Sequence, residues 1–236
     1  MSLIKSNLAR IRERIESAAR RAGRDPGTIR LVAVSKTVAP ERIREAVESG
    51  VHILGENYLQ EAQGKIEVLG AGISWHFIGH LQKNKAKYAI RFFDLIHSVD
   101  NLALAEELNR AAEKSSKIQE ILLQADLSGE ATKFGAAEEE IVPLAEGISA
   151  LKNLSLKGLM TLPPFSEDPE DSRPYFRKLR LLGERLAQMK IPGISADELS
   201  MGMSGDFETA IEEGATLVRL GTSIFGPRPP KHSVFA

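Results

Sequence analysis

The sequence predicts an α/β protein, a (β/α)8 TIM barrel with an extra N-terminal helix. From residue 30 onward, short apolar runs alternate with stretches of helical periodicity, which is typical of a parallel sheet with crossover helices. We count eight such apolar runs, and eight is the number of strands that closes this barrel. Before them lies one amphipathic helical segment, which accounts for the extra helix.

The elements follow in this order. Ile4, Leu8, Ile11 and Ile15 recur at three- and four-residue spacing, and Gly23 then stops the first helix. We expect strands at residues 30–36, 51–55, 74–79, 94–99, 120–127, 155–162, 198–202 and 216–221. We expect helices near residues 40–49, 57–69, 82–91, 101–114, 136–149, 170–190 and 204–213, with a short one after Gly221. No stretch resembles a linker, so residues 1–236 should form a single domain.

An open, doubly wound sheet is the alternative fold, because a strand count from one sequence can err by a strand or two. No G-x-G-x-x-G motif follows the first predicted strand. The dinucleotide fingerprint is therefore missing, and the barrel is preferred.

The composition disfavours several classes of partner. The 31 Lys and Arg residues balance 32 Asp and Glu residues along the chain, so we expect no nucleic-acid and no membrane-surface partner. The absence of cysteine removes disulfides and thiolate metal sites and fits a reducing compartment. The N-terminus has no apolar signal segment and no later run reaches the length of a membrane span, so a cytoplasmic location is expected.

The candidate site is the end of the barrel where the strands finish, because chemistry in this architecture lies at the carboxyl ends of the strands. The residues predicted there are Lys36, Gly55, Glu56, Asn57, Tyr58, Gly79, His80, Met160, Thr161, Ser200, Met201, Gly202, Met203, Ser204, Arg219, Leu220, Gly221 and Thr222.

Lys36 ends an apolar strand, where a lysine often only extends its ammonium group into water. At a barrel end, however, partial desolvation lowers the pKa of an amine and suits it to form a Schiff base. Lys133 and Lys157 are alternatives for this role. Lys157 lies in the middle of a strand and should point outward between helices, and Lys133 lies in a polar loop.

Two segments offer a phosphate site. In SMGMSGDFETAI and RLGTSIFG, small residues lead into a helix, so Ser200, Ser204, Gly221 and Thr222 could bring hydroxyl and N–H groups to a phosphate. They follow the seventh and eighth strands, where this architecture frequently binds phosphate. Each segment alone is more often a turn with an N-cap, but two at the expected strands favour the site.

The histidines give no metal site. His76 alternates with Trp75 and Phe77 and is interpreted as a structural histidine, whereas His80 is better placed at a strand end. The histidines at positions 52, 97 and 232 show no metal-ligand spacing.

The segments AVSKT, GENY, WHFIGHLQKNK, GLM, LSMGMSGDFETAI and VRLGTSIFG resemble, in order and spacing, the pyridoxal phosphate homeostasis protein family, stand-alone relatives of the alanine racemase N-terminal barrel. The resemblance extends from Leu31 to Gly226. It implies a fold-type III barrel that holds pyridoxal 5′-phosphate (PLP) as a Schiff base on Lys36. It further implies that Arg219 faces the pyridine nitrogen, that Asn57, His80 and Met160 line the site, and that the phosphate lies among Ser200, Ser204, Gly221 and Thr222.

The chemistry of the residues favours a carrier over a strong catalyst. A guanidinium can donate but not accept a proton, so Arg219 beside the ring nitrogen disfavours its protonation and weakens the ring as an electron sink. Racemisation also needs a second acid or base opposite Lys36, and Tyr58 is the one tyrosine near the predicted site. We therefore expect a protein of PLP homeostasis without strong catalytic activity.

Apo forms of PLP-dependent enzymes are expected as recipients of the cofactor, and the protein is expected to be a monomer. An amino-acid racemase that uses PLP, with Tyr58, His80 or a group of the substrate as the second acid or base, is the alternative function. A cofactor-free Schiff-base aldolase acting on a phosphorylated sugar is a third.

Overall fold

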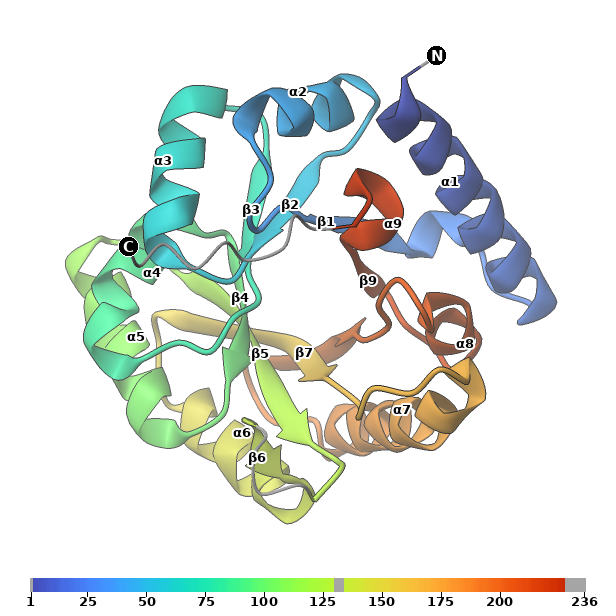
Figure 1. The fold of residues 1–236 in the computed structure, drawn as a ribbon. Helices are drawn as coiled ribbons and strands as arrows, with labels where there is room; N and C mark the ends of the chain where they lie inside the picture. Colours follow the sequence, from blue (N-terminus) through green and yellow to red (C-terminus); the bar gives the residue numbers. More distant parts are fainter. Residues whose placement is uncertain (1, 130–133, 228–236) are drawn as a thin grey trace, which may run out of the picture.

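The computed structural model describes residues 2–129 and 134–227 and shows a closed parallel barrel ringed by helices (Figure 1). The strands pair in the order β4-β3-β2-β1-β9-β8-β7-β5, and pairing of β4 with β5 closes the barrel. The predicted barrel is thus confirmed. Its strands are β1 (Arg30–Val34), β2 (Ile53–Glu56), β3 (Ser74–Phe77), β4 (Leu95–Val99), β5 (Gln119–Asp126), β7 (Leu154–Thr161), β8 (Ile194–Ser200) and β9 (Leu217–Leu220).

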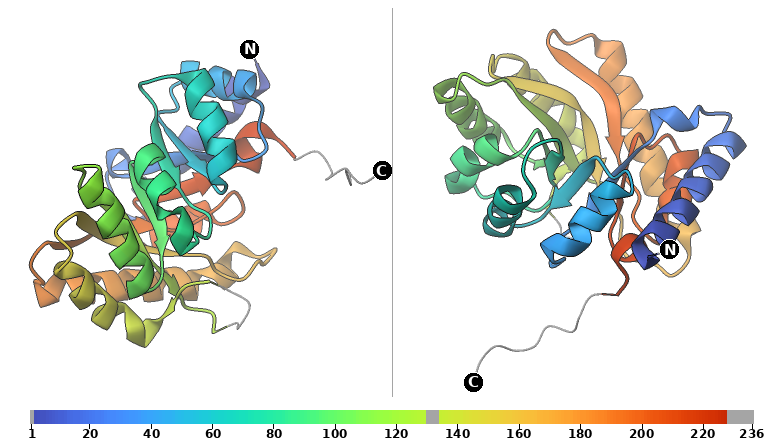
Figure 2. Two further views of the ribbon diagram at one scale, coloured as in Figure 1. Left: turned by 90° about the vertical axis from the view of Figure 1, so that its left-hand side faces the viewer. Right: turned by 90° about the horizontal axis from the view of Figure 1, so that it is seen from above.

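Helices surround the barrel on all sides (Figures 1 and 2). They are α1 (Leu3–Arg21), α2 (Pro40–Glu48), α3 (Leu59–Leu69), α4 (Ala86–Phe92), α5 (Leu102–Lys114), α6 (Ile141–Ser149), α7 (Arg173–Met189), α8 (Phe207–Glu212) and α9 (Thr222–Phe225). The extra helix α1 lies beside α8 and α9, as expected from its apolar stripe, and Ile4, Leu8, Ile11 and Ile15 on that stripe are all buried.

The apolar residues form two cores, because successive side chains of a strand point to opposite faces. One core lies between the strands and the helices and includes Ala33, Ile96 and Leu220. The other fills the inside of the barrel, which we call the lumen, and is formed by Val32, Leu95, Leu122, Met160 and Leu217. The lumen is therefore packed and leaves chemistry to the ends of the strands.

Several predicted boundaries differ from the structure, and two of the differences come from strand pairing that the sequence did not predict. The helix expected at 136–149 begins at Ile141, because residues 136–137 form a short strand, β6 (Ala136–Ala137), that pairs with the end of β5, and a 3-10 turn (Glu138–Glu140) follows. Strand β8 begins at Ile194, four residues before the predicted start at residue 198. The segment ISAD lacks a clear apolar pattern, but its first residue pairs with β7. The spacing of apolar residues predicts which face of an element is buried, but it does not predict which backbone segments form hydrogen bonds with each other.

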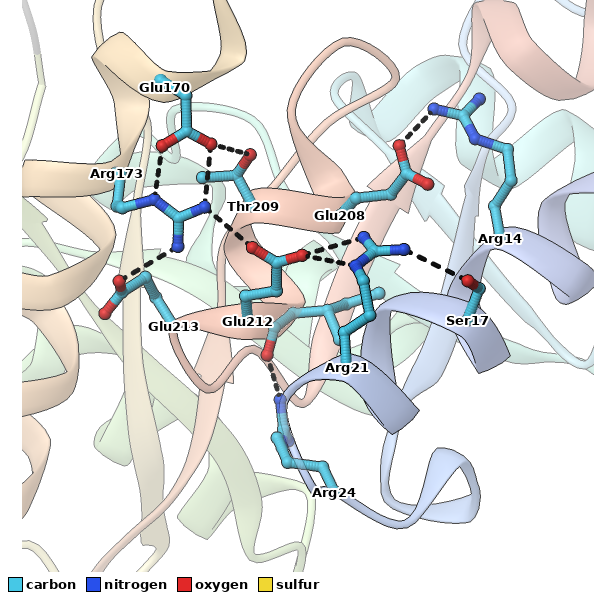
Figure 3. Close-up of polar contacts among 11 residues, drawn as sticks. Arg14, Ser17, Arg21, Arg24, Glu170, Arg173, Glu208, Thr209, Glu212 and Glu213 are labelled. Atoms are coloured by element: carbon cyan, nitrogen blue, oxygen red, sulfur yellow. Dashed lines mark hydrogen bonds and ion pairs between the residues drawn. The ribbon is translucent and has the colours of Figure 1, made fainter.

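Ion pairs attach α1 to helix α8 (Figure 3). Arg14 pairs with Glu208 and Arg21 with Glu212, each at 2.8 Å, and Glu212 also accepts from Arg173. The buried Asn7 amide donates to the Ile224 carbonyl at 2.9 Å. Helix α1 therefore holds α8 and α9 against the barrel.

Across residues 2–129 and 134–227, no helix is long and apolar enough to cross a membrane.

Candidate functional site

The turn after β1 brings Lys36 to the carboxyl end of the barrel, which we call the mouth. Val32 lies in the lumen core, and the two-residue alternation places Lys36 on the same side two positions beyond Val34. Lys36 is half-buried, and it lines a narrow cavity together with Thr37, Arg42, Gly221 and Thr222. The structure therefore brings together the predicted amine and two of the predicted phosphate residues.

A charged cluster, formed by Ser35, Glu56, Glu61 and Lys65, holds this turn from behind, and all of its members except Glu61 are buried. The Lys65 ammonium donates to the Ser35 carbonyl at 2.6 Å and to Glu56 and Glu61 at 2.7 and 2.6 Å. The Ser35 hydroxyl donates to Glu56 at 2.6 Å, and Glu61 accepts from the backbone N–H of Thr37. We call these four residues the Lys65 cluster.

The Lys65 cluster fixes both residues that flank Lys36. Thr37 has a φ of 62°, a left-handed conformation that costs a side-chain-bearing residue energy and persists where contacts hold it. Burial raises the pKa of Glu56, while hydrogen bonds from Lys65 and Ser35 act against that rise. The direction of the Lys36 backbone is therefore set by the buried pair of Glu56 and Lys65 together with the partly buried Glu61.

Arg219 enters the lumen from β9 and is 4% exposed. Its guanidinium donates to the Ser200 hydroxyl at 2.6 Å and to the Thr161 carbonyl at 2.9 Å. Burial lowers the pKa of Arg219 to about 10, so the group remains a cation at neutral pH. Both of these partners are neutral, and the guanidinium has further N–H donors to offer to an acceptor in the site.

Ser200 is also bonded to a pair of buried histidines. Its hydroxyl lies 2.9 Å from Nδ1 of His97, and Nε2 of His97 lies 2.9 Å from Nδ1 of His76. Burial, followed by the charge of Arg30, lowers the pKa of His76 to about 4, and burial holds the pKa of His97 well below its usual value. Both rings are therefore neutral at pH 7, and His76 is buried and bonded as a structural histidine should be.

The loops after β8 and β9 meet at Ser204. Its hydroxyl lies 3.1 Å from that of Ser223 and, at 3.4 Å, accepts from the backbone N–H of Gly221 and of Ser223. Gly202 adopts a φ of 89°, and a Cβ there would lie 2.6 Å from Cβ of Ala210, so glycine permits this loop to turn back onto α8. Ser204, Gly221 and Thr222 are therefore close together at the start of α9.

Asn57 and His80 line a different space. With Tyr58, Lys85 and Tyr88 they border an open groove of about 640 Å³ between α3 and α4, and Lys36 is not among its lining residues. A Cβ on Gly79 would lie 2.3 Å from the Asn57 carbonyl, so glycine allows the two loops to touch. The buried Asn57 Oδ1 has no hydrogen-bond partner, and the His80 ring stacks on Phe134 at 3.8 Å.

Met160 and the alternative lysines lie elsewhere. Met160 is fully buried in the lumen core. Lys157 pairs with Glu120 at 3.2 Å and lines a cavity at the opposite, N-terminal end of the barrel, rather than pointing outward between helices. Lys133 lies outside the described residues. Lys157 is therefore at the wrong end of the barrel to serve the mouth.

Sequence reasoning missed the supporting residues. His97 was set aside for its lack of metal-ligand spacing, although its two-residue offset from Leu95 in a strand could have placed it in the lumen. Glu56 was expected among the residues at the strand ends but was given no role, and Lys65 was passed over within a helix. A charged residue in an amphipathic helix is expected to face solvent, so the sequence does not show that this one is buried.

The residues present fit a phosphorylated carbonyl compound that carries a hydrogen-bond acceptor. Lys36 supplies an amine, Gly221 and Thr222 lie in the same cavity, and the buried Arg219 offers donors without a carboxylate among its bonded partners. The unpaired Asn57 Oδ1 marks a further polar position beside the mouth.

Comparisons with known proteins agree with this geometry. The model of the alanine racemase N-terminal domain family matches residues 6–229. A pyridoxal phosphate homeostasis protein of Aquifex aeolicus is 47% identical, covering 94% of this chain and 96% of its own, and one of Pseudomonas aeruginosa is 44% identical, covering 97% of each chain. The structure of PipY from Synechococcus elongatus, solved with PLP bound, superposes with a TM-score of 0.84 at 36% identity, covering 94% of this chain and all of that one. The chain therefore belongs to the pyridoxal phosphate homeostasis protein family, within the wider alanine racemase N-terminal domain family.

Proposed function

We propose that this protein binds PLP as a Schiff base on Lys36 and serves intracellular PLP homeostasis without strong catalytic activity. The observation that carries the proposal is the meeting of Lys36 with Gly221 and Thr222 in one cavity at the mouth. The relatives' names and the PLP bound to PipY support it. PLP supplies an aldehyde for the lysine, an acidic phosphate and a pyridine ring that can withdraw electrons.

Each group of residues has a distinct task in this proposal. Lys36 holds the aldehyde end, and Ser204, Gly221 and Thr222 receive the phosphate. Arg219 donates to the ring nitrogen, and Ser200 and Thr161 fix the guanidinium from behind. Asn57 and His80 follow β2 and β3 at the carboxyl end of the barrel, beside the cavity that holds Lys36, and Met160 lies below it in the lumen core.

The arrangement favours holding the cofactor over turning over a substrate. Because Arg219 remains cationic and cannot accept a proton, it keeps the ring nitrogen unprotonated and the ring a weak electron sink. None of the three tyrosines lines the cavity that holds Lys36, so a second acid or base is not supplied there by tyrosine. Buffering of free PLP and its delivery to apo forms of PLP-dependent enzymes are the finer roles we propose, in the cytoplasm and as a monomer.

Visible absorbance of the purified protein mixed with PLP tests the proposal. The wild-type protein should give the band of a lysine Schiff base, and Lys36→Ala should lose it. Lys157→Ala is the matched control, because Lys157 is a barrel-strand lysine at the opposite end, and it should keep the band. An unchanged spectrum in Lys36→Ala would reject the site.

Exchange of the α-hydrogen separates a carrier from a racemase. Amino acids incubated with the loaded protein in deuterium oxide should exchange slowly and keep their configuration. Rapid exchange with inversion would replace the carrier by the racemase.

A further inference from the structure

A continuous hydrogen-bonded chain runs through the lumen below the candidate cofactor site. It consists of Arg219, Ser200, His97 and His76, which we call the lumen chain. Its successive contacts measure 2.6, 2.9 and 2.9 Å. All four residues are nearly or fully buried, and each comes from one of β9, β8, β4 and β3. It begins at the mouth and ends at the cavity on the N-terminal side, which His76 lines.

The direction of each hydrogen bond in this chain follows from Arg219 and from the burial of Ser200. A guanidinium only donates, so the Ser200 oxygen accepts from it. Ser200 is fully buried, and among the described residues its hydroxyl contacts only Arg219 and His97, so its O–H is satisfied by donating to Nδ1 of His97. A His97 ring that accepts at Nδ1 carries its hydrogen on Nε2 and donates it to Nδ1 of His76. Both histidines are thus required in the Nε2–H tautomer.

The setting supports this assignment. Burial keeps the pKa values of His76 and His97 below neutral pH, so both rings are uncharged and each nitrogen has one role. The neighbouring lumen residues Leu95 and Leu217 are apolar and offer no competing partner. Ser200 therefore depends on His97 for the orientation of its hydroxyl.

We propose that His97 is a positioning residue of the cofactor site: acting through the Ser200 hydroxyl, it holds the Arg219 guanidinium in the orientation that meets the ring of PLP. This inference rests on the proposed function for the identity of the ligand. The orientation of Arg219, however, is set by contacts within the protein and can be measured without PLP. The second guanidinium contact, to the Thr161 carbonyl, leaves the group free to tilt if the Ser200 contact is lost. His97 thereby acts on the cofactor pocket without lining the mouth.

The first test uses the protein without PLP. Nitrogen-15 NMR of the histidine rings should show His76 and His97 as neutral Nε2–H tautomers at pH 7. His97→Leu removes the acceptor and should shift the Arg219 Nε–H resonance, whereas His97→Asn, whose amide oxygen can replace Nδ1, should retain most of the wild-type signal. Ser98→Ala is the matched control, because Ser98 is equally buried on the same strand but has no hydrogen-bond partner.

The second test measures PLP affinity in the same variants by absorbance. His97→Leu should weaken binding about tenfold, which is the worth of one hydrogen bond, with His97→Asn intermediate and Ser98→Ala unchanged. If His97→Leu fails to fold, Ser200→Ala breaks the same contact from the other side and should shift the ring signals of His97.

The outcomes separate the two proposals. An Nδ1–H tautomer at His97, or an Arg219 resonance that is unmoved in His97→Leu, would overturn the positioning role whether or not PLP binds. A wild-type protein that shows the expected tautomers and the Arg219 shift but binds no PLP would reject the proposed function and leave the positioning of Arg219 standing.

Discussion

At the scale of single residues, the site is built on polar groups that are withheld from water. Arg219 is a buried cation that is bonded to a hydroxyl and a carbonyl, and its burial alone lowers its pKa to about 10. His76 and His97 are buried and neutral. Burying a polar group lowers the stability of the fold unless the group makes its hydrogen bonds. The lumen chain therefore stabilises the fold only while Arg219 is protonated and both histidines are neutral.

This pattern predicts acid sensitivity. The folded-state pKa of His76 lies near 4, below the unfolded value of 6.5, so the unfolded chain binds the proton more readily between these two values. The free energy of unfolding should therefore fall as pH drops from 6.5 to 4, by about 3 kcal/mol from His76. Urea denaturation of wild-type protein and His76→Gln at pH 7 and pH 4.5 measures this. The difference between the two proteins should change with pH, and a constant difference would contradict the assignment.

Residues that end strands were predictable, and residues that support them were not. Lys36, Gly221 and Thr222 fall where apolar runs stop, and the alternation of strands and helices brings such ends together. His97 follows the apolar residues Leu95 and Ile96 in the segment DLIHSV, and its two partners come from two other strands, β8 and β3. Which side chains of different strands meet depends on the register of the strands in the sheet. The apolar pattern of a single strand does not determine that register.

At the scale of elements, the turn from β1 to α2 depends on α3. Lys65 on α3 contacts the Ser35 carbonyl and both carboxylates, and Glu61 on the same helix holds the N–H of Thr37. Helix α3 therefore does more than cover the barrel, because it fixes the residues on both sides of Lys36.

Lys65→Met should show this dependence. Removing the ammonium leaves Glu56 buried without its cation, which should cost about 3 to 5 kcal/mol of unfolding free energy. The looser turn should also weaken PLP binding to Lys36. Urea denaturation and absorbance titration measure the two effects.

The double variant Lys65→Met with Glu56→Gln serves as the control. It removes both buried charges and should recover much of the stability, because the unpaired carboxylate is the costly group. A double variant as unstable as Lys65→Met would show that the packing of the Lys65 stem, and not the charge, holds the turn.

At the scale of the whole molecule, α1 joins the first residues of the chain to the loops after the last strands. Arg14 and Arg21 pair with carboxylates of α8 (Figure 3). The Asn7 amide donates to the Ile224 carbonyl of α9. The loops that carry Ser204, Gly221 and Thr222 are thereby supported from outside the barrel. The amphipathic stripe of α1 was readable from the sequence, but the carboxylates that receive its arginines were not.

Arg173 should be the most sensitive member of this ion-pair group, because it contacts Glu170, Glu212 and Glu213 together. Arg173→Met should lower the free energy of unfolding by about 2 kcal/mol at low salt and by less at high salt, since ions screen exposed pairs. Arg110→Met, which loses one exposed pair with Glu107, should change it by less than about 1 kcal/mol. Equal losses in the two variants would show that the group acts as separate surface pairs.

Reduction of the PLP-loaded protein with borohydride, followed by peptide mass spectrometry, tests whether the mouth of the barrel holds the cofactor. The reduction makes the lysine adduct permanent, so the modified residue can be read from the peptide masses. We predict one pyridoxyl group per chain on the peptide that contains Lys36. Modification of a different lysine, or a chain with no pyridoxyl group after loading, would contradict the assignment.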